Sequence, residues 1–100
     1  MENFIGKYVV CRFKNAGVHA GILKAKEGQT VHLQNSRRLW YWDGAASLSE
    51  LAMFGVSKPE NCKFPCVVND EIIEEEIEII PCTEIAQKSI SEVPEWKMRK

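Results

Sequence analysis

Two arginines and three large aromatic side chains lie within six consecutive residues, Arg37-Arg38-Leu39-Trp40-Tyr41-Trp42. Side chains alternate between the two faces of a β-strand, so in a strand Arg38, Trp40 and Trp42 would share one face. A guanidinium group binds phosphate oxygens through paired hydrogen bonds, and an indole ring stacks on a base. The segment therefore predicts a site for a small anionic, nucleotide-like ligand.

Two other places in the sequence add residues to the predicted site. His19 lies between glycines in Gly17-Val18-His19-Ala20-Gly21, where the missing side chains let a ligand or a second backbone come close. Gly44 lies at the corner between the aromatic segment and a predicted helix, a place where pockets often form. The predicted ligand-binding residues are Arg37, Arg38, Trp40, Trp42, His19, Gly17 and Gly44.

A structural role for the same residues stays open. Leu39 and Tyr41, or both tryptophans, could instead be ordinary core. A single histidine in a strand is more often structural than functional. The two arginines argue against a wholly structural segment, because charged side chains are rarely buried.

The cysteines do not predict a metal site. Cys62 and Cys66 are four residues apart and Cys82 follows sixteen later, whereas structural zinc sites usually show pairs of short spacings. We also find no phosphate-binding glycine loop, nucleophile elbow or metal-type histidine pair. We therefore predict no catalytic residue, no metal and no cofactor, although a dyad of Cys11 with His19 across a hairpin stays open.

Length and composition predict one folded domain over residues 1–100. The 100 residues leave no room for a second core of ordinary size, and 45% hydrophobic with 27% charged residues is typical of a folded protein. Such a small domain often buries more surface by forming a homo-oligomer. With no signal peptide and no long apolar run, we expect a cytoplasmic protein with free thiols and no membrane contact.

The charges divide unevenly along the chain. Residues 1–42 hold seven Lys/Arg and two Glu, a net charge of +5, and residues 43–100 hold six Lys/Arg and twelve Asp/Glu, a net charge of −6. A basic N-terminal surface would favour an anionic ligand. Equally, the two parts could complement each other within the fold or between subunits.

Periodicity and turn residues predict an α+β fold, a small antiparallel β-sheet or SH3-like barrel with two short helices. A four-stranded meander is expected over residues 4–42, with a break at Asn35-Ser36 and Arg37–Trp42 as its fourth strand. Ser47 and Glu50 form a capping box for a helix at about 48–54. Further strands at about 64–80 flank Asn69-Asp70, and Thr83 caps a helix at about 84–90 before Trp96 and a basic tail at 97–100.

The chain resembles a family of small proteins of tailed phages and prophages. The resemblance rests on an Arg-Arg-x-Trp-x-Trp-x-Gly-Ala core at residues 37–45 and on shorter segments, among them Ile5-Gly6-Lys7-Tyr8-Val9-Val10 and Pro59-Glu60-Asn61-Cys62-Lys63. It implies a role in the host cytoplasm during infection. By analogy with phage proteins that sequester nucleotide signals of host immunity, it suggests a counter-defence function.

Taken together, the sequence predicts a non-enzymatic, homo-oligomeric protein that binds a small anionic nucleotide-like ligand. One alternative is a protein-interaction module that docks on a host protein through the same aromatic residues. A further alternative is a small barrel that binds nucleic acid, against which the negative net charge argues.

Overall fold

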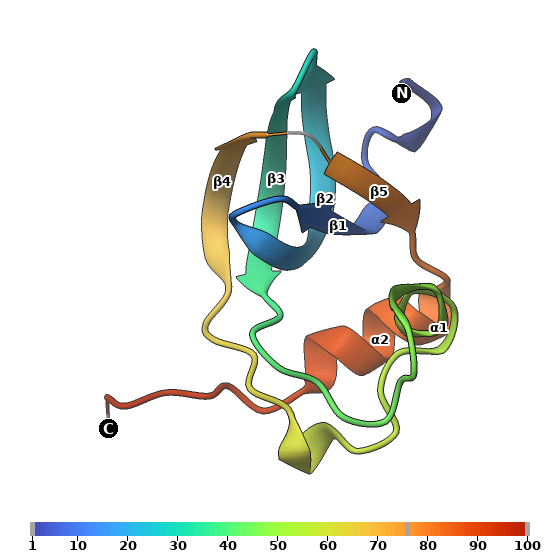
Figure 1. Cartoon of the computed structure of the whole chain (residues 1–100), viewed down its shortest axis with the longest axis vertical. Helices are drawn as coiled ribbons and strands as arrows, with labels where there is room; N and C mark the ends of the chain where they lie inside the picture. Colours follow the sequence, from blue (N-terminus) through green and yellow to red (C-terminus); the bar gives the residue numbers. More distant parts are fainter. Residues whose placement is uncertain (1, 76, 100) are drawn as a thin grey trace.

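The computed structural model describes residues 2–75 and 77–99 and shows a five-stranded antiparallel sheet with two α-helices (Figure 1). This confirms the predicted fold class, a small antiparallel α+β fold. The strands are β1 (Tyr8–Phe13), β2 (Gly17–Glu27), β3 (Thr30–Arg38), β4 (Val68–Glu74) and β5 (Ile77–Pro81). The helices are α1 (Leu48–Phe54) and α2 (Glu84–Glu92), with short 3₁₀ helices at Glu2–Phe4 and Pro59–Asn61.

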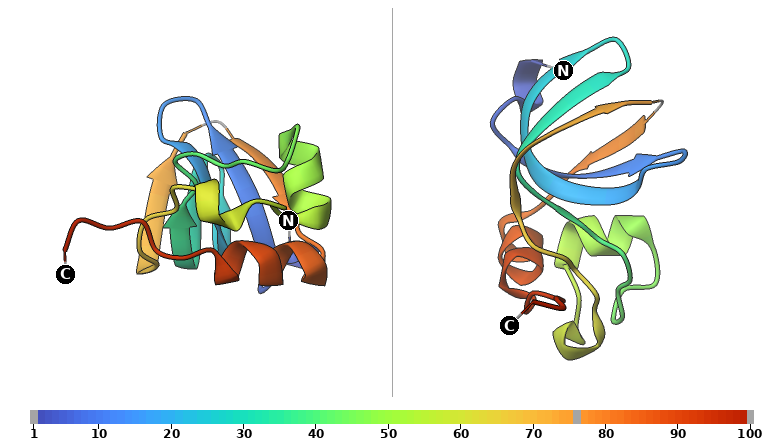
Figure 2. Two further views of the ribbon diagram at one scale, coloured as in Figure 1. Left: turned by 90° about the horizontal axis from the view of Figure 1, so that it is seen from below. Right: turned by 90° about the vertical axis from the view of Figure 1, so that its left-hand side faces the viewer.

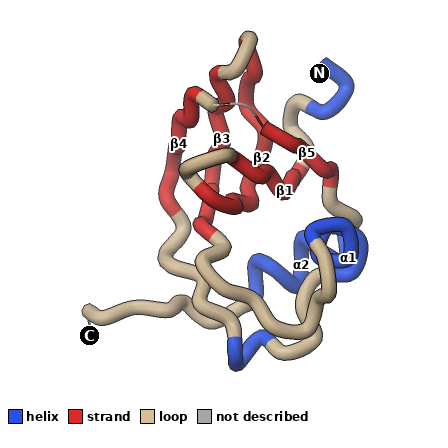
Figure 3. Tube along the Cα trace, viewed as in Figure 1, coloured by secondary structure: helices blue, strands red, loops and turns tan. Residues whose placement is uncertain are grey.

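The strands are arranged in the order β4-β3-β2-β1-β5, so the two strands nearest the C-terminus form the two edges of the sheet. β1 lies between β2 and β5, and β4 pairs only with β3 among the described residues. Figures 2 and 3 show that the sheet is strongly curled and that both helices lie beyond one end of it. No helix among the described residues has the length and apolar character needed to cross a bilayer.

Two bulges between β2 and β3 help to curl the sheet. The register passes from Ala20↔Arg37 to Ile22↔Gln34, so Gly21 alone faces two residues of β3. One of the two, Asn35, has a positive φ of 49°, and a Cβ on Gly21 would lie 2.9 Å from the Ser36 Cα. A second shift follows between Leu23 and Ala25. Bulges of this kind bend a strand and increase its twist.

The core has two parts, one on each side of β1. Val9, Cys11 and Phe13 belong to a cluster enclosed by strands alone, while Tyr8 and Val10 belong to a second cluster between the sheet and the helices. Burial on both faces explains why β1 begins with a continuous apolar run, Tyr8–Cys11, rather than an alternating pattern. The second cluster continues through Leu39, Leu51, Phe64, Ile90 and Val93.

Both helices begin at the residues that the sequence predicts. The Ser47 hydroxyl accepts from Glu50 N at 3.1 Å, and Glu50 in turn accepts from Ala46 N. The Thr83 hydroxyl accepts from Ala86 N at 3.1 Å and also donates to Met53 O at 2.6 Å, which joins α2 to the end of α1. Helix α1 ends at Phe54 as expected, and α2 runs two residues beyond the predicted end.

Several predicted strand limits are wrong. Arg37–Trp42 is not a separate fourth strand, because β3 continues through the bulge to Arg38 and the chain then leaves the sheet, with only an isolated bridge from Tyr41 to Lys63. The fourth strand of the meander is instead β4. Asn69-Asp70 lies inside β4 rather than in a turn, since Asp70 pairs across the strands with Gln34.

The two ends of the chain also differ in part from the prediction. β1 begins at Tyr8, and residues 2–4 form a 3₁₀ helix. Trp96 is tied to the body by a hydrogen bond from its amide to Phe64 O at 3.0 Å, although its side chain remains 48% exposed. Of the predicted basic tail, Lys100 lies outside the described residues.

Candidate functional site

A pocket of about 270 Å³ lies between the β1–β2 turn and the segment that follows β3. It brings together Gly17, Arg38, Trp40 and Trp42, which are four of the residues that the sequence predicts for the ligand site. The remaining lining residues are Asn15, Ala16, Val18 and Leu39. We call this the Arg38 pocket.

Arg38 supplies the positive charge of the pocket. Its side chain is exposed at the end of β3, and Nη1 donates one hydrogen bond to Ala16 O at 3.1 Å. The described residues provide no carboxylate within ion-pair distance of it. Since a guanidinium has five N–H donors, most of them remain available to the oxygens of a ligand.

The two tryptophans form different parts of the wall. Trp42 is partly buried and packs against the core between sheet and helices, so its indole is held in place. Trp40 lines the pocket and is 64% exposed, so much of its side chain is open to solvent. Together with Arg38 they place a cation beside aromatic surfaces, as the sequence predicts, although an irregular segment rather than a strand face does so.

The opposite wall is the β1–β2 turn, which carboxylate and imidazole groups hold in place. The Glu75 carboxylate accepts from Asn15 N and from Ala16 N, each at 2.8 Å. His19 Nε2 lies 2.8 Å from Ala16 O, the same carbonyl that Arg38 contacts. These bonds fix the turn before any ligand binds, which reduces the cost of ordering the site.

His19 lies behind this wall rather than in the pocket. Its side chain is fully buried, and Nδ1 lies 2.9 Å from the Glu71 carboxylate without the alignment of a good hydrogen bond. Both ring nitrogens therefore lie beside oxygen atoms, and the imidazole fills the space between the β1–β2 turn and Glu71 of β4. His19 is a structural residue that supports the turn, and its predicted direct contact with a ligand is not possible in this structure.

Ser36, His19 and Glu71 are the residue types of a hydrolytic triad, but their contacts do not match one. The Ser36 hydroxyl donates to Glu71 Oε1 at 2.7 Å instead of to the imidazole. Ser36 and His19 are both fully buried, so no substrate reaches the hydroxyl. A catalytic serine needs a hydrogen bond to its base and access to substrate.

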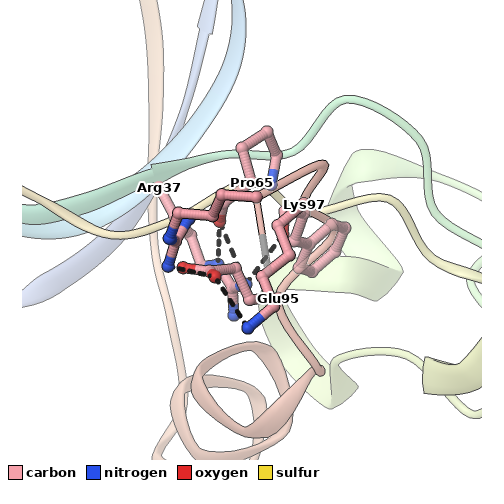
Figure 4. Close-up of polar contacts among 6 residues, drawn as sticks. Arg37, Pro65, Glu95 and Lys97 are labelled. Carbon is pink, nitrogen blue, oxygen red and sulfur yellow. Dashed lines mark hydrogen bonds and ion pairs between the residues drawn. The ribbon is translucent and has the colours of Figure 1, made fainter.

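Arg37 is buried and does not line the Arg38 pocket, which corrects its predicted role. Its Nη1 donates to Ile90 O and Val93 O at 3.1 and 3.0 Å, at the end of α2. Its Nη2 donates to Phe64 O at 2.9 Å, and Nε and Nη2 both donate to Pro65 O (Figure 4). Desolvation by burial lowers the pKa of Arg37. Its guanidinium N–H groups already donate to backbone carbonyls, so they are not available to a ligand.

Gly44 also serves the fold and not the pocket. Its φ is 95°, and a Cβ at this position would lie 2.5 Å from Ser57 N. The Gly44 carbonyl accepts from Ser57 N and from the Ser57 hydroxyl, each at 3.3 Å. Glycine is therefore required because a neighbouring backbone comes close.

The Cys11 and His19 pair lacks the properties of a catalytic dyad. The two residues are opposite each other on β1 and β2, but both are fully buried. Burial raises the pKa of the Cys11 thiol to about 12, so it stays protonated at neutral pH. Within residues 2–75 and 77–99, no three His, Cys, Asp or Glu side chains are grouped as a metal site requires.

The structure also shows a groove that the sequence does not predict. Two hollows of about 380 and 230 Å³ meet at Tyr8, Ile22 and Gln87, between the sheet and α2. Its lining comes from many separate segments, so no local motif marks it. Among the described residues that line it, Lys7 and the already hydrogen-bonded Arg37 are the cations, and the Glu84 carboxylate also lies there, which makes the groove less suited to an anion than the Arg38 pocket.

A family model described as "Domain of unknown function (DUF6948)" matches residues 6–90 of the chain. The matched residues include every lining residue of the Arg38 pocket. Searches of the curated proteins and of the solved structures gave no match.

Proposed function

We propose that the chain, which belongs to the DUF6948 family, is a non-enzymatic binding protein whose Arg38 pocket holds a small anionic ligand with an aromatic ring, such as a nucleotide. The main support is one observation, an available guanidinium beside two indoles around a single hollow. The guanidinium would bind the phosphate, and the exposed Trp40 ring would stack on the base.

The size of the pocket limits the ligand. Its volume of about 270 Å³ is close to the lower end of the range of roughly 300–1,000 Å³ that is usual for small-molecule sites. One base with its phosphate fits this volume better than a dinucleotide within one subunit. A larger cyclic dinucleotide would need the pockets of two subunits.

The biological part of the proposal is a counter-defence role. The sequence resemblance to phage proteins suggests that the ligand is a nucleotide-derived signal of the host and that binding removes it from solution. Sequestration needs no catalytic group, and the buried Ser36 and His19 offer none to a substrate. A homo-oligomer in the host cytoplasm is part of the same proposal.

Calorimetric titration with a panel of linear and cyclic mononucleotides and cyclic dinucleotides tests the pocket. We expect at least one nucleotide to bind, and Arg38→Ala to weaken it by roughly 10–100-fold, because hydrogen bonds to a charged group contribute about 1.5–3 kcal/mol. Trp40→Ala should also weaken binding, and Trp40→Phe should restore part of it. Lys24→Ala is the matched control, since it removes an exposed positive charge from β2 outside the pocket.

Two results would contradict the proposal. One is the absence of binding across the whole panel, and the other is Arg38→Ala binding as tightly as the unmodified chain. Recovery of the nucleotide chemically unchanged after incubation supports binding without catalysis. A changed nucleotide would show that the protein is an enzyme.

A second candidate function, docking on a host protein, has an observation of its own. Trp40, Tyr41 and Trp96 are 64%, 51% and 48% exposed, and tryptophan and tyrosine dominate interface hot spots. The Lys63 ammonium lies 5.6 Å from the Trp96 ring, and Lys63 also pairs with Tyr41. Capture of one stoichiometric host protein, lost in Trp40→Ala, together with a nucleotide panel that shows no binding, would favour this function.

Binding of nucleic acid is the remaining alternative. It predicts a mobility shift with oligonucleotides that weakens steeply as salt rises, because released counterions drive such binding. A shift that is absent or insensitive to salt removes it.

A further inference from the structure

We propose that the outer edge of β4 binds the C-terminal arm of a second copy of this chain. The arm is defined as residues 94–99, which follow α2. The proposal concerns self-assembly and does not depend on the ligand of the Arg38 pocket. It rests on an open strand edge, a projecting segment with a strand pattern, and their opposite charges.

β4 is an open edge of the sheet. It pairs with β3 on one side, and the described residues provide no partner on the other. Its register with β3 is regular from Thr30↔Glu74 to Ser36↔Val68, and residues 68–74 contain no proline or lysine. Proline, lysine and bulges are the usual devices that prevent a strand from pairing at an edge.

Apolar and acidic side chains accompany this edge. Three large apolar residues are exposed here: Val67, Val68 and Ile72, at 52%, 41% and 64%. Exposed apolar side chains on an open edge favour pairing with another strand. Asp70 and Glu74 are exposed and make the strand acidic, whereas the Glu71 carboxylate accepts from the buried Ser36 hydroxyl. Figure 1 shows β4 at one border of the sheet, with no helix over its outer side.

The arm has complementary features. Val93 is buried, and the Trp96 amide donates a hydrogen bond to Phe64 O. Figures 1 and 2 show that the C-terminal end of the chain then extends away from the rest of the molecule. Trp96 and Met98 alternate with Lys97 and Arg99, an apolar and basic alternation that is typical of a strand. Met98 is 99% exposed, so the arm lacks an apolar contact of its own there.

Charge favours the arm over a second β4 as the occupant. Two β4 edges placed together would bring acidic side chains against each other, which is unfavourable for cross-strand neighbours. The arm would instead place Lys97 and Arg99 beside those acids. Within one chain these cations contact Glu95 at 4.0 and 2.6 Å, exposed ion pairs of small energy that leave them able to change partner (Figure 4).

The arm of the same chain does not lie along this edge. Trp96 is anchored at Phe64, and the three described residues beyond it span about 10 Å when extended. Figure 1 shows this segment directed away from β4. Two copies related by a two-fold axis could each place an arm on the edge of the other, which adds main-chain hydrogen bonds to the charge contacts.

Charge-exchange variants test the proposal by analytical ultracentrifugation over the micromolar range. The unmodified chain should dimerise, and each of two variants, Lys97→Glu with Arg99→Glu and Asp70→Lys with Glu74→Lys, should dimerise at least tenfold more weakly. An equal mixture of the two variants should form a heterodimer, because an acidic arm then meets a basic edge and a basic arm meets an acidic edge. Removal of residues 97–100 should give a monomer.

Matched controls separate this surface from general effects of charge. Lys7→Glu with Lys88→Glu makes the same charge change at exposed positions away from β4 and should leave the dimer intact. Circular dichroism checks that each variant folds, and the truncated chain tests the arm without any reversed charge. A chain that stays monomeric throughout, or a dimer that survives removal of residues 97–100, would overturn the proposal.

Discussion

Arg37 and Arg38 are neighbours in β3, and their side chains have opposite surroundings. Arg37 is opposite Ala20 and points toward the helices, where four backbone carbonyls accept from its donors. Arg38 is opposite His19 and makes a single hydrogen bond at the surface. The available charge of the pair therefore belongs to Arg38 alone, and the proposed ligand site depends on that one residue.

At the residue scale, we predict that iodoacetamide at pH 8 alkylates Cys66 and spares the other cysteines. Burial raises the pKa of Cys11 and of Cys82 to about 12, and it raises the pKa of Cys62 as well. A raised thiol pKa leaves almost no thiolate, the reactive form, at pH 8. Cys66 is exposed, so the reagent can reach it.

Peptide mass spectrometry of the alkylated protein provides the measurement. In urea all four cysteines should react, which serves as the control for reagent and digestion. Native alkylation of Cys11 at the rate of Cys66 would show that the strand-enclosed core opens readily.

At the element scale, the Thr83 hydroxyl makes two stabilising hydrogen bonds at the start of α2. Thr83 caps α2 and donates to the last turn of α1, whereas Ser47 only caps α1. We predict that Thr83→Val lowers the free energy of unfolding by about 2 kcal/mol and Ser47→Ala by about 1 kcal/mol, within the range for lost caps and hydrogen bonds. Urea titration followed by circular dichroism measures both.

Thr83→Ser keeps the hydroxyl that makes both hydrogen bonds, and as the control it should retain most of the free energy of unfolding that Thr83→Val loses. Equal losses for Thr83→Val and Ser47→Ala would mean that the bond between the helices contributes nothing.

The helices could be predicted from the sequence better than the strands, because helix caps are local. Ser47, Glu50 and Thr83 mark their helices through bonds to residues three or four positions away. The end of β3 and the bulge at Gly21 depend on distant partners, so the sequence indicated a break at Asn35-Ser36 where the strand continues.

The candidate site was predictable in part for the same reason. The types and spacing of Arg38, Trp40 and Trp42 identify a cation with aromatic neighbours, and these residues do line one pocket. The acceptors of Arg37 lie about thirty and fifty residues later in the chain, so no local pattern reveals its burial. His19 does lie beside the β1–β2 turn, but it contacts the turn from the buried side and not from the pocket.

At the scale of the whole molecule, Arg37 joins the sheet, the segment before β4 and the end of α2. We predict that Arg37→Met, which keeps a similar volume, lowers the free energy of unfolding by about 3 kcal/mol or more, because several buried carbonyls lose their donors. For a domain of this size the melting temperature should fall by roughly 12–24 °C. Thermal unfolding followed by circular dichroism tests this.

Arg12→Met is the matched control, since Arg12 is an exposed arginine on β1. Its effect should be below about 0.5 kcal/mol, as for most surface substitutions. If Arg37→Met unfolds no more easily than Arg12→Met, the carbonyls must find water as a substitute donor.

The position of β1 between β2 and β5 has a consequence for synthesis of the chain. A ribosome releases residues 8–13 more than sixty residues before their second neighbour, residues 77–81. The carbonyls of Ile90 and Val93 that Arg37 needs come later still. The nascent protein must therefore keep one side of β1 and a charged core residue without their native partners until residues 77–93 have been released, so the sheet and the core cannot be completed as the first three strands emerge.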